Sequence, residues 1–109
     1  MASLFLKAYG DNPKLRVLDF LLTFEDFDYS MKDIAKFSEV SYTALKEIWK
    51  ALVKRKIVIH TRTVGKAKMY KLNRDNPLVE KFIDYYWSIA DLEANKESNK
   101  EEALVHIAS

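Results

Sequence analysis

Between residues 41 and 54, apolar side chains recur every three or four residues, which is the period of an amphipathic α-helix with one buried face. Ser41 precedes them and is a good N-cap, because its hydroxyl can accept a hydrogen bond from a free backbone N–H. The apolar positions are Ala44, Leu45, Ile48, Trp49, Leu52 and Val53. The outer face is then polar and mostly basic, and carries Tyr42, Thr43, Lys46, Glu47, Lys50 and Lys54.

Two runs typical of β-strands follow this helix, at residues 56–64 and 67–73. They are separated by Gly65 and Lys66, and a glycine between two such runs indicates a hairpin turn. A helix with a basic outer face that leads directly into a basic hairpin predicts a surface for a nucleic-acid backbone.

The preceding part of the chain predicts two further helices. Asn12 can cap the first, and Pro13 suits its first turn; leucines and Val17 then give this helix a wide apolar face that should support the domain. A second helix over residues 31–37 is capped by Ser30. Residues 27–29 are expected to form a short edge strand that pairs with the hairpin.

A last helix is predicted over residues 77–92, and apolar or aromatic residues surround much of it. Such a helix needs cover on more than one side, so we expect a homodimer to form through it, although a helix buried within one chain is the alternative. The expected interface residues are Leu78, Phe82, Tyr85, Tyr86 and Ile89. We expect one domain over residues 1–92, followed by a polar, flexible tail at 93–109.

Charge is distributed very unevenly along the chain. The net charge of all 109 residues is only +2, yet residues 40–74 contain ten basic residues and one acidic residue, which gives this segment +9. Clustered basic charge is the electrostatic footprint of phosphate binding, whereas a merely solvated face is the alternative.

Three short sequences resemble the second half of a winged helix-turn-helix domain of the broad MarR- and ArsR-like type of transcription regulator. They are SYTAL at 41–45, LVKRKIV at 52–58, and RTVGK at 62–66 followed by YKL at 70–72. The resemblance covers residues 12–92 and implies an α+β, mainly α fold with a two-stranded wing and a C-terminal dimerisation helix. Lys56 departs from the family, which usually has glycine there, so the exit of the helix is expected to differ in detail.

Together, the charge pattern and the resemblance predict a sequence-specific regulator that binds double-stranded DNA as a homodimer. The helix over 41–54 would enter the major groove, and the wing over 62–68 would contact the backbone or the minor groove. The candidate DNA-binding residues are Ser41, Tyr42, Thr43, Lys46, Lys50, Lys54, Arg62, Lys66 and Lys68. Trp49 and Tyr70 are expected to pack in the core instead of stacking on bases.

Other functions find little support in the sequence. The chain has no cysteine, its histidines His60 and His106 lie far apart, and no phosphate-binding glycine-rich loop is present, so neither an enzyme nor a cofactor or metal is expected. No apolar run is long enough for a membrane span, and a cytoplasmic protein is expected. The alternative function is a protein-interaction module within a transcription or chromatin assembly; no residue identifies a small-molecule effector.

Overall fold

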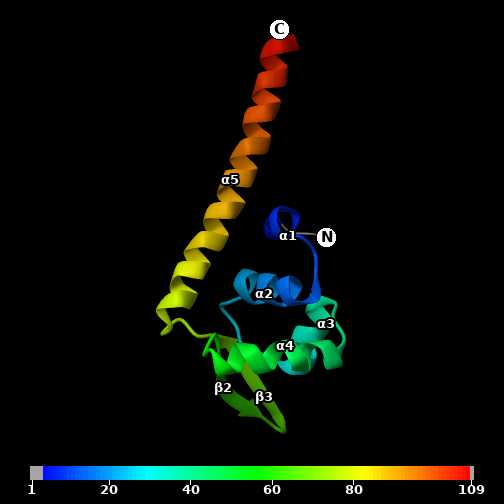
Figure 1. Ribbon diagram of the computed structural model, residues 1–109, viewed down its shortest axis with the longest axis vertical. Helices are drawn as coiled ribbons and strands as arrows, with labels where there is room; N and C mark the ends of the chain where they lie inside the picture. Colours follow the sequence, from blue (N-terminus) through cyan, green and yellow to red (C-terminus); the bar gives the residue numbers. More distant parts are fainter. Residues whose placement is uncertain (1–3, 109) are drawn as a thin grey trace.

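The computed structural model describes residues 4–108, with side chains described for residues 4–92, 94 and 95. Figure 1 shows the helices and strands, and the longest two strands follow one another late in the chain. In chain order the elements are α1 (Leu4–Tyr9), α2 (Pro13–Thr23), β1 (Tyr29–Ser30), α3 (Met31–Ser38), α4 (Tyr42–Lys54), β2 (Val58–Val64), β3 (Ala67–Leu72) and α5 (Pro77–Ala108). The mainly helical α+β class predicted from the sequence is confirmed.

The helices α2, α3 and α4 begin where the capping residues predict. The side chain of Asn12 accepts a hydrogen bond from the backbone N–H three residues further on at 3.0 Å, and Ser30 and Ser41 do the same at 3.2 and 3.1 Å. Each cap satisfies one of the N–H groups that the first turn of a helix leaves without an internal partner.

The three strands form one antiparallel sheet in the order β1-β3-β2. Strand β1 pairs Tyr29 with Tyr70 and Ser30 with Met69 of β3, which confirms the predicted edge strand, although it lies at residues 29–30 and not 27–29. At the tip of the β2–β3 hairpin, Val64 pairs with Ala67, and Gly65 takes a positive φ of 62°. Glycine at the first position of a two-residue loop is typical of a type II′ turn, whose twist suits a hairpin.

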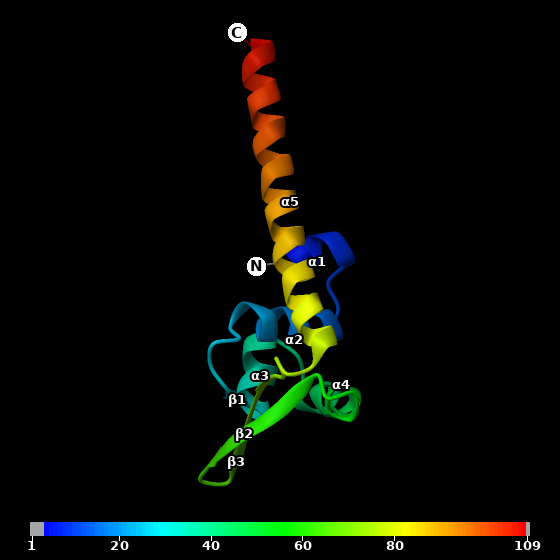
Figure 2. The ribbon, with the colours of Figure 1, turned by 90° about the vertical axis from the view of Figure 1, so that its left-hand side faces the viewer.

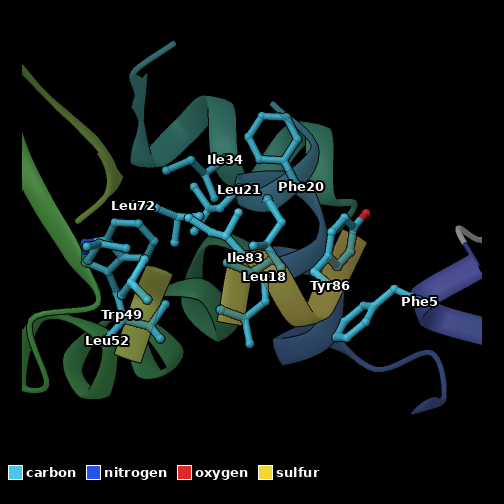
Figure 3. Packing of buried hydrophobic residues seen from close by; sticks show 14 of the residues in the cluster. Phe5, Leu18, Phe20, Leu21, Ile34, Trp49, Leu52, Leu72, Ile83 and Tyr86 are labelled. Carbon is cyan, nitrogen blue, oxygen red and sulfur yellow. The ribbon is translucent and has the colours of Figure 1, made fainter. Parts of the chain in front are cut away.

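The core lies between α2, the two helices that follow it and the first half of α5 (Figure 3). Helix α2 contacts α1, α3, α4 and β3, so it is the central support that its apolar face predicted. Trp49 is buried, and its ring meets that of Tyr70 edge-on with 5.3 Å between centroids. The prediction that both aromatic residues pack in the core is therefore confirmed.

The end of α4 differs from our expectation. Lys56 adopts the left-handed conformation, with φ 57°, that glycine usually supplies. Its N–H donates to Val53 O at 3.0 Å, and the N–H of Ile57 donates to Leu52 O at 2.9 Å, which is the Schellman pattern. The side chains of Asn73 and Asn76 both donate to the carbonyl of Lys56, at 3.0 and 3.1 Å. These tertiary hydrogen bonds stabilise the left-handed helix end that glycine usually forms, although residue 56 is a lysine.

Helix α5 is longer than predicted. It continues to Ala108 and does not end near Leu92, whereas the expected flexibility of the segment 93–109 stays a prediction. Residues 93–108 contain neither glycine nor proline and are rich in glutamate, lysine and alanine, which favour helix and provide no stop signal. The second half of α5 extends away from the rest of the molecule (Figures 1 and 2). With this helix included, the longest dimension of the molecule is 62 Å.

The first half of α5 packs against α1. The ring of Phe5 lies 6.2 Å from that of Phe82 and 5.2 Å from that of Tyr86. Tyr86 is 4% exposed and Ile89 8% exposed, and the hydroxyl of Tyr86 donates to Asp19 at 2.8 Å. Both residues are already buried within one chain, and Phe5 of α1 and Asp19 of α2 contact Tyr86, so the predicted contact of Tyr86 and Ile89 with a second subunit stays a prediction with a competing environment.

Candidate nucleic-acid interface

The outer face of α4 presents three exposed lysines one turn apart. Lys46, Lys50 and Lys54 lie on the same side of the helix because residues four apart share a face. The ammonium of Lys46 lies 4.8 Å above the ring of Tyr42, which supports the lysine side chain near the start of the helix. Lys50 pairs with Glu47 at 3.0 Å, but both side chains are well exposed, so the pair is weak and leaves Lys50 available.

A hollow of about 400 Å³ lies between the start of α3, the start of α4 and the β2–β3 hairpin. Three lysines line it, from two different elements: Lys32 from α3, and Lys66 and Lys68 from the hairpin. Hydroxyl-bearing and apolar residues complete the lining, namely Ser30, Met31, Tyr42, Ala67 and Tyr70. Among the described side chains these lysines have no carboxylate partner, so their charge is free for an anion.

A second, shallower hollow of about 470 Å³ runs along α4 and contains Lys46, Lys50 and Lys54. It adjoins the first because Met31 lines both. The two hollows form one basic surface, which we call the lysine surface: Lys32, Lys46, Lys50, Lys54, Lys66 and Lys68. In Figure 2, α4 and the hairpin lie together at the end of the molecule opposite the C-terminal half of α5.

Arg62 has a partner within the chain. Its guanidinium donates two hydrogen bonds to Asp28, with Nε to Oδ2 at 2.9 Å and Nη2 to Oδ1 at 3.1 Å. The hydroxyl of Thr61 donates to the same carboxylate at 2.5 Å. The strand register shifts between His60 and Arg62, and a bulge of this kind re-aims neighbouring side chains. The guanidinium lowers the pKa of Asp28 to about 2, and Thr61 adds to the effect.

Arg74 is also paired within the chain. It donates to Glu25 at 3.0 and 2.6 Å and to Glu80 at 3.0 Å, and therefore ties the loop after α2 to the first turn of α5. The hydrogen bonds to Glu25 raise the pKa of Arg74 above its ordinary value. Arg62 and Arg74 thus brace the hairpin and α5, and the cations left for a partner are mainly lysines.

Comparison with known proteins gives the fold. No protein-family model and no curated protein matches the sequence. Among solved structures, the Staphylococcus aureus MepR–DNA complex shares 17% identity over 94% of this chain and 83% of that chain, with a TM-score of 0.63. The adhesin competence repressor AdcR from Streptococcus pyogenes shares 18% identity over 93% of this chain and 80% of that one, again with a TM-score of 0.63.

A third similar structure is the homodimeric winged helix-turn-helix DNA-binding domain of Mb0332 from Mycobacterium bovis, described as a possible ArsR-family regulator. It shares 19% identity over 85% of this chain and 81% of that chain, with a TM-score of 0.57. This chain has the winged helix-turn-helix fold. Helices α3 and α4 are its helix-turn-helix, and the β2–β3 hairpin is its wing.

The winged helix brings most of the predicted DNA-binding residues together. Tyr42 and Thr43 are exposed at the amino end of α4, and Ser41 precedes them as the cap. Arg62 lies on the wing, but Asp28 holds it, so its predicted contact with DNA stays a prediction with a competing partner. Lys32 was missed. Lys32 lies in the first turn of α3, the first helix of the helix-turn-helix. That position was the available signal in the sequence, but a single lysine there does not show that it faces the wing.

Exposed apolar residues form a seam along α5. Leu78, Tyr85 and Leu92 are 74%, 50% and 67% exposed and recur every seven residues. Phe82 and Ile89 fall between them at spacings of four and three, as in a heptad pattern, but Ile89 is buried within the chain and Phe82 is partly buried against the core. Tyr9 of α1 hydrogen-bonds to the hydroxyl of Tyr85 and extends this surface. Three of the five predicted interface residues therefore remain accessible, namely Leu78, Phe82 and Tyr85.

Metal-binding groups are not assembled on the described part of the winged helix. Within it, no three His, Cys, Asp or Glu residues come together in a group that could hold a metal ion. His60 lies in β2, where its ring nitrogen is 3.0 Å from the hydroxyl of Thr63, as expected for a strand residue. No helix in the described residues has the length and apolar character needed to cross a membrane.

Proposed function

We propose that the protein is a sequence-specific, double-stranded DNA-binding transcription regulator that acts as a homodimer. The observation that carries the proposal is the lysine surface, in which exposed lysines from α3, α4 and the wing converge on one end of the molecule, and of these lysines only Lys50 has a carboxylate partner among the described side chains. A similar fold occurs in MepR, whose structure in complex with DNA is known. Lysine contacts to phosphates supply much of the affinity of such proteins for duplex DNA.

Helix α4 is the proposed recognition helix. An α-helix fits the major groove, and the amino-terminal residues of a recognition helix contact base edges, so Tyr42 and Thr43 are the proposed reading residues. Lys46 and Lys50, one and two turns further on, would contact phosphates or guanine edges. Lys66 and Lys68 on the wing would contact the backbone or the minor groove.

The exposed seam of α5 is the proposed dimer interface. Leu78, Tyr85 and Leu92 would meet their copies across a two-fold axis, which removes these exposed apolar side chains from water. A two-fold dimer presents two recognition helices to successive major grooves, about 34 Å apart on one face of the duplex. The bound site is therefore expected to be a pseudo-palindrome.

The proposal is tested by selecting bound sites from random duplex DNA and by measuring binding at several salt concentrations. Enrichment of a two-fold motif is the expected result. The double variant Lys46→Ala, Lys50→Ala should bind the selected site more weakly, and its logarithmic salt slope should be less steep by about two per protomer if each lysine contacts a phosphate. The variant Lys7→Ala, Lys81→Ala removes the same charge from α1 and α5, so it should leave the slope unchanged. Equal slopes for both variants would refute the assignment of α4.

A protein-interaction module is the second candidate, and one observation favours it. Phe24, Phe27 and Phe37 are all more than half exposed, and the rings of Phe24 and Phe37 lie 5.4 and 5.7 Å from that of Phe20. Clustered exposed aromatic residues can mark a protein-binding surface. Failure to enrich any duplex sequence, together with salt-insensitive binding, would favour this candidate over the regulator.

A further inference from the structure

A groove of about 380 Å³ lies between α1, α2 and the end of α3. Its apolar lining comes from Leu6 and three phenylalanines, Phe20, Phe24 and Phe37. Phe20, which Figure 3 labels, is buried, whereas Phe24 and Phe37 are more than half exposed and pack against it from two sides of the chain. The ammonium of Lys36 lies 5.9 Å from the centroid of the Phe37 ring, so a cation already contacts one of these rings.

The charged residues of the groove are mostly acidic. Asp11, Asp19 and Glu39 line it together with one arginine, Arg16, which gives a net charge of −2. Arg16 donates two hydrogen bonds to Asp11, from Nε at 2.5 Å and from Nη2 at 3.1 Å, and they lower the pKa of Asp11. That pair is neutral as a unit, so the excess negative charge comes from Asp19 and Glu39. Glu39 has no ion pair among the described side chains.

Ser38 is a second and independent indication that the groove receives a partner. It lines the groove and is 5% exposed, and its hydroxyl has no hydrogen-bond partner among the described residues. A buried hydroxyl without a partner costs free energy, and most such groups in native structures are satisfied. A polar group brought into the groove by an occupant would remove this cost.

We propose that this groove docks a partner protein through a segment in which an arginine stands beside aliphatic residues. The guanidinium would lie against the rings of Phe24 and Phe37, where cation–π attraction acts, and would donate to Glu39. Arginine suits such a site because its planar head is weakly hydrated, stacks on aromatic rings and has five N–H donors, one of which can serve Ser38. The aliphatic neighbours would cover the exposed parts of the phenylalanines and Leu6.

The groove is separate from the lysine surface, because no residue lines both. Helix α3 connects the two: Lys32 in its first turn belongs to the lysine surface, and Phe37 near its end belongs to the groove. A duplex on the lysine surface therefore does not use the docking residues, and the proposed regulator would hold its partner protein beside the bound site. This consequence rests on the proposed function, whereas docking of a basic segment does not.

Docking is tested by selecting from a displayed library of random nonapeptides with a fixed central arginine, on the full chain without DNA. Enriched peptides should carry aliphatic residues next to the arginine. A synthetic peptide of the enriched sequence should lose about tenfold in affinity when glutamine replaces the arginine, since charge-assisted hydrogen bonds are lost. Failure to enrich any sequence, or equal affinity of the arginine and glutamine peptides, would overturn the proposal. So would ethylguanidinium that binds as tightly as the peptide, because the groove would then hold a small cation and not a protein segment.

Two pairs of matched variants locate the docking site. Phe37→Ala should weaken binding of the selected peptide roughly threefold. Its control is Phe27→Ala, because Phe27 is exposed but does not line the groove. Glu39→Asn should weaken binding about tenfold, and asparagine tolerates the φ of 57° that Glu39 adopts. Asp91→Asn removes the same charge from an exposed position on α5 and should bind the peptide as the wild type does. Equal affinities within either pair would show that the peptide binds elsewhere.

Ser38→Ala separates a group that contacts the partner from one that only supports the fold. Because the hydroxyl has no partner in the free chain, the variant should keep or raise the urea midpoint and still bind the peptide several times more weakly. A lower midpoint together with unchanged peptide affinity would contradict the proposal.

A second copy of the chain is the competing occupant, because Arg55 is exposed, has no carboxylate partner among the described side chains and stands near Val53 and Ile57. Wild type, Arg55→Ala and the seam variant Tyr85→Asp are expected to bind the peptide alike. Binding by either variant but not by the wild type would show that a second copy fills the groove, and would overturn the proposal. Duplex affinity is measured in parallel on Phe37→Ala, which should match the wild type, so a failure of docking is distinguished from a failure of DNA binding.

Discussion

Replacement of Lys56 by glycine should stabilise the protein. Lys56 has a φ of 57°, a conformation in which the Cβ of an L-residue lies too close to the following carbonyl oxygen, at a cost of about 1–2 kcal/mol. Glycine removes this cost but loses more chain entropy on folding, about 0.5–1 kcal/mol relative to alanine. The Lys56 side chain is exposed and has no ion pair among the described residues, so little else is lost. The net gain should be roughly 0.5–1 kcal/mol.

Thermal and urea unfolding measure this gain. For a chain of this size the midpoint temperature should rise by about 2–6 °C, and the urea midpoint should rise without a change in the m-value. Lys54→Gly is the control, because residue 54 lies within α4, where glycine should cost up to about 1 kcal/mol. Opposite signs for the two variants are expected. A loss of stability in Lys56→Gly would mean that the hydrogen bonds from Asn73 and Asn76 do not hold the left-handed geometry described.

Three further predictions follow from the ion pairs, the seam and the wing. Asp28→Asn should be less stable than wild type at neutral pH, because the pKa of Asp28 is lowered to about 2 by Arg62 and Thr61. A carboxyl group whose pKa is lowered by folding stabilises the folded state at pH values above its unfolded-state pKa of about 3.9. The difference in unfolding free energy between wild type and Asp28→Asn should therefore shrink as the pH falls from about 4 towards 2 in a series of urea titrations. Tyr85→Asp should give the mass of one chain in light scattering, where the wild type gives two; a wild-type mass of one chain would defeat the dimer. Lys66→Ala should weaken binding to all duplexes alike and flatten the salt slope by about one per protomer, and loss restricted to one sequence would contradict its role on the backbone.

Local signals in the sequence were sufficient for most of the fold. Asn12, Ser30 and Ser41 each precede an apolar periodic segment, and each caps a helix in the structure. Gly65 between two β-rich runs gives the wing. These signals are reliable because the hydrogen bonds concerned join residues two to four positions apart, so the sequence contains both partners within one short window.

The long helix α5 shows a feature that hydrophobic periodicity does not predict, namely which of its apolar side chains are buried. Tyr86 and Tyr85 are adjacent and equally aromatic, yet one is buried and the other half exposed. The difference comes from α1, whose Phe5 lies more than seventy residues away and covers only one side of α5. Apolar residues on several sides of a helix indicate that more than one neighbouring element must cover it, but they do not indicate which side is covered by the same chain.

Clustered charge has a similar limit, and the ion pairs explain it. The +9 segment predicts a basic surface, but Arg62 and Arg74 are paired with Asp28 and Glu25, which lie 34 and 49 residues earlier in the chain. Because these acids lie outside the segment, a count along the sequence overstates the charge available to a partner. Two of the three arginines in the segment, each able to form two parallel hydrogen bonds to a carboxylate, brace the wing and α5. Lysines, which act as compact point charges on flexible stems, are left to face the solvent, which suits contacts to phosphates more than a fixed reading of bases. On this reasoning Tyr42 and Thr43, and not the cluster of cations, would carry the discrimination between DNA sequences.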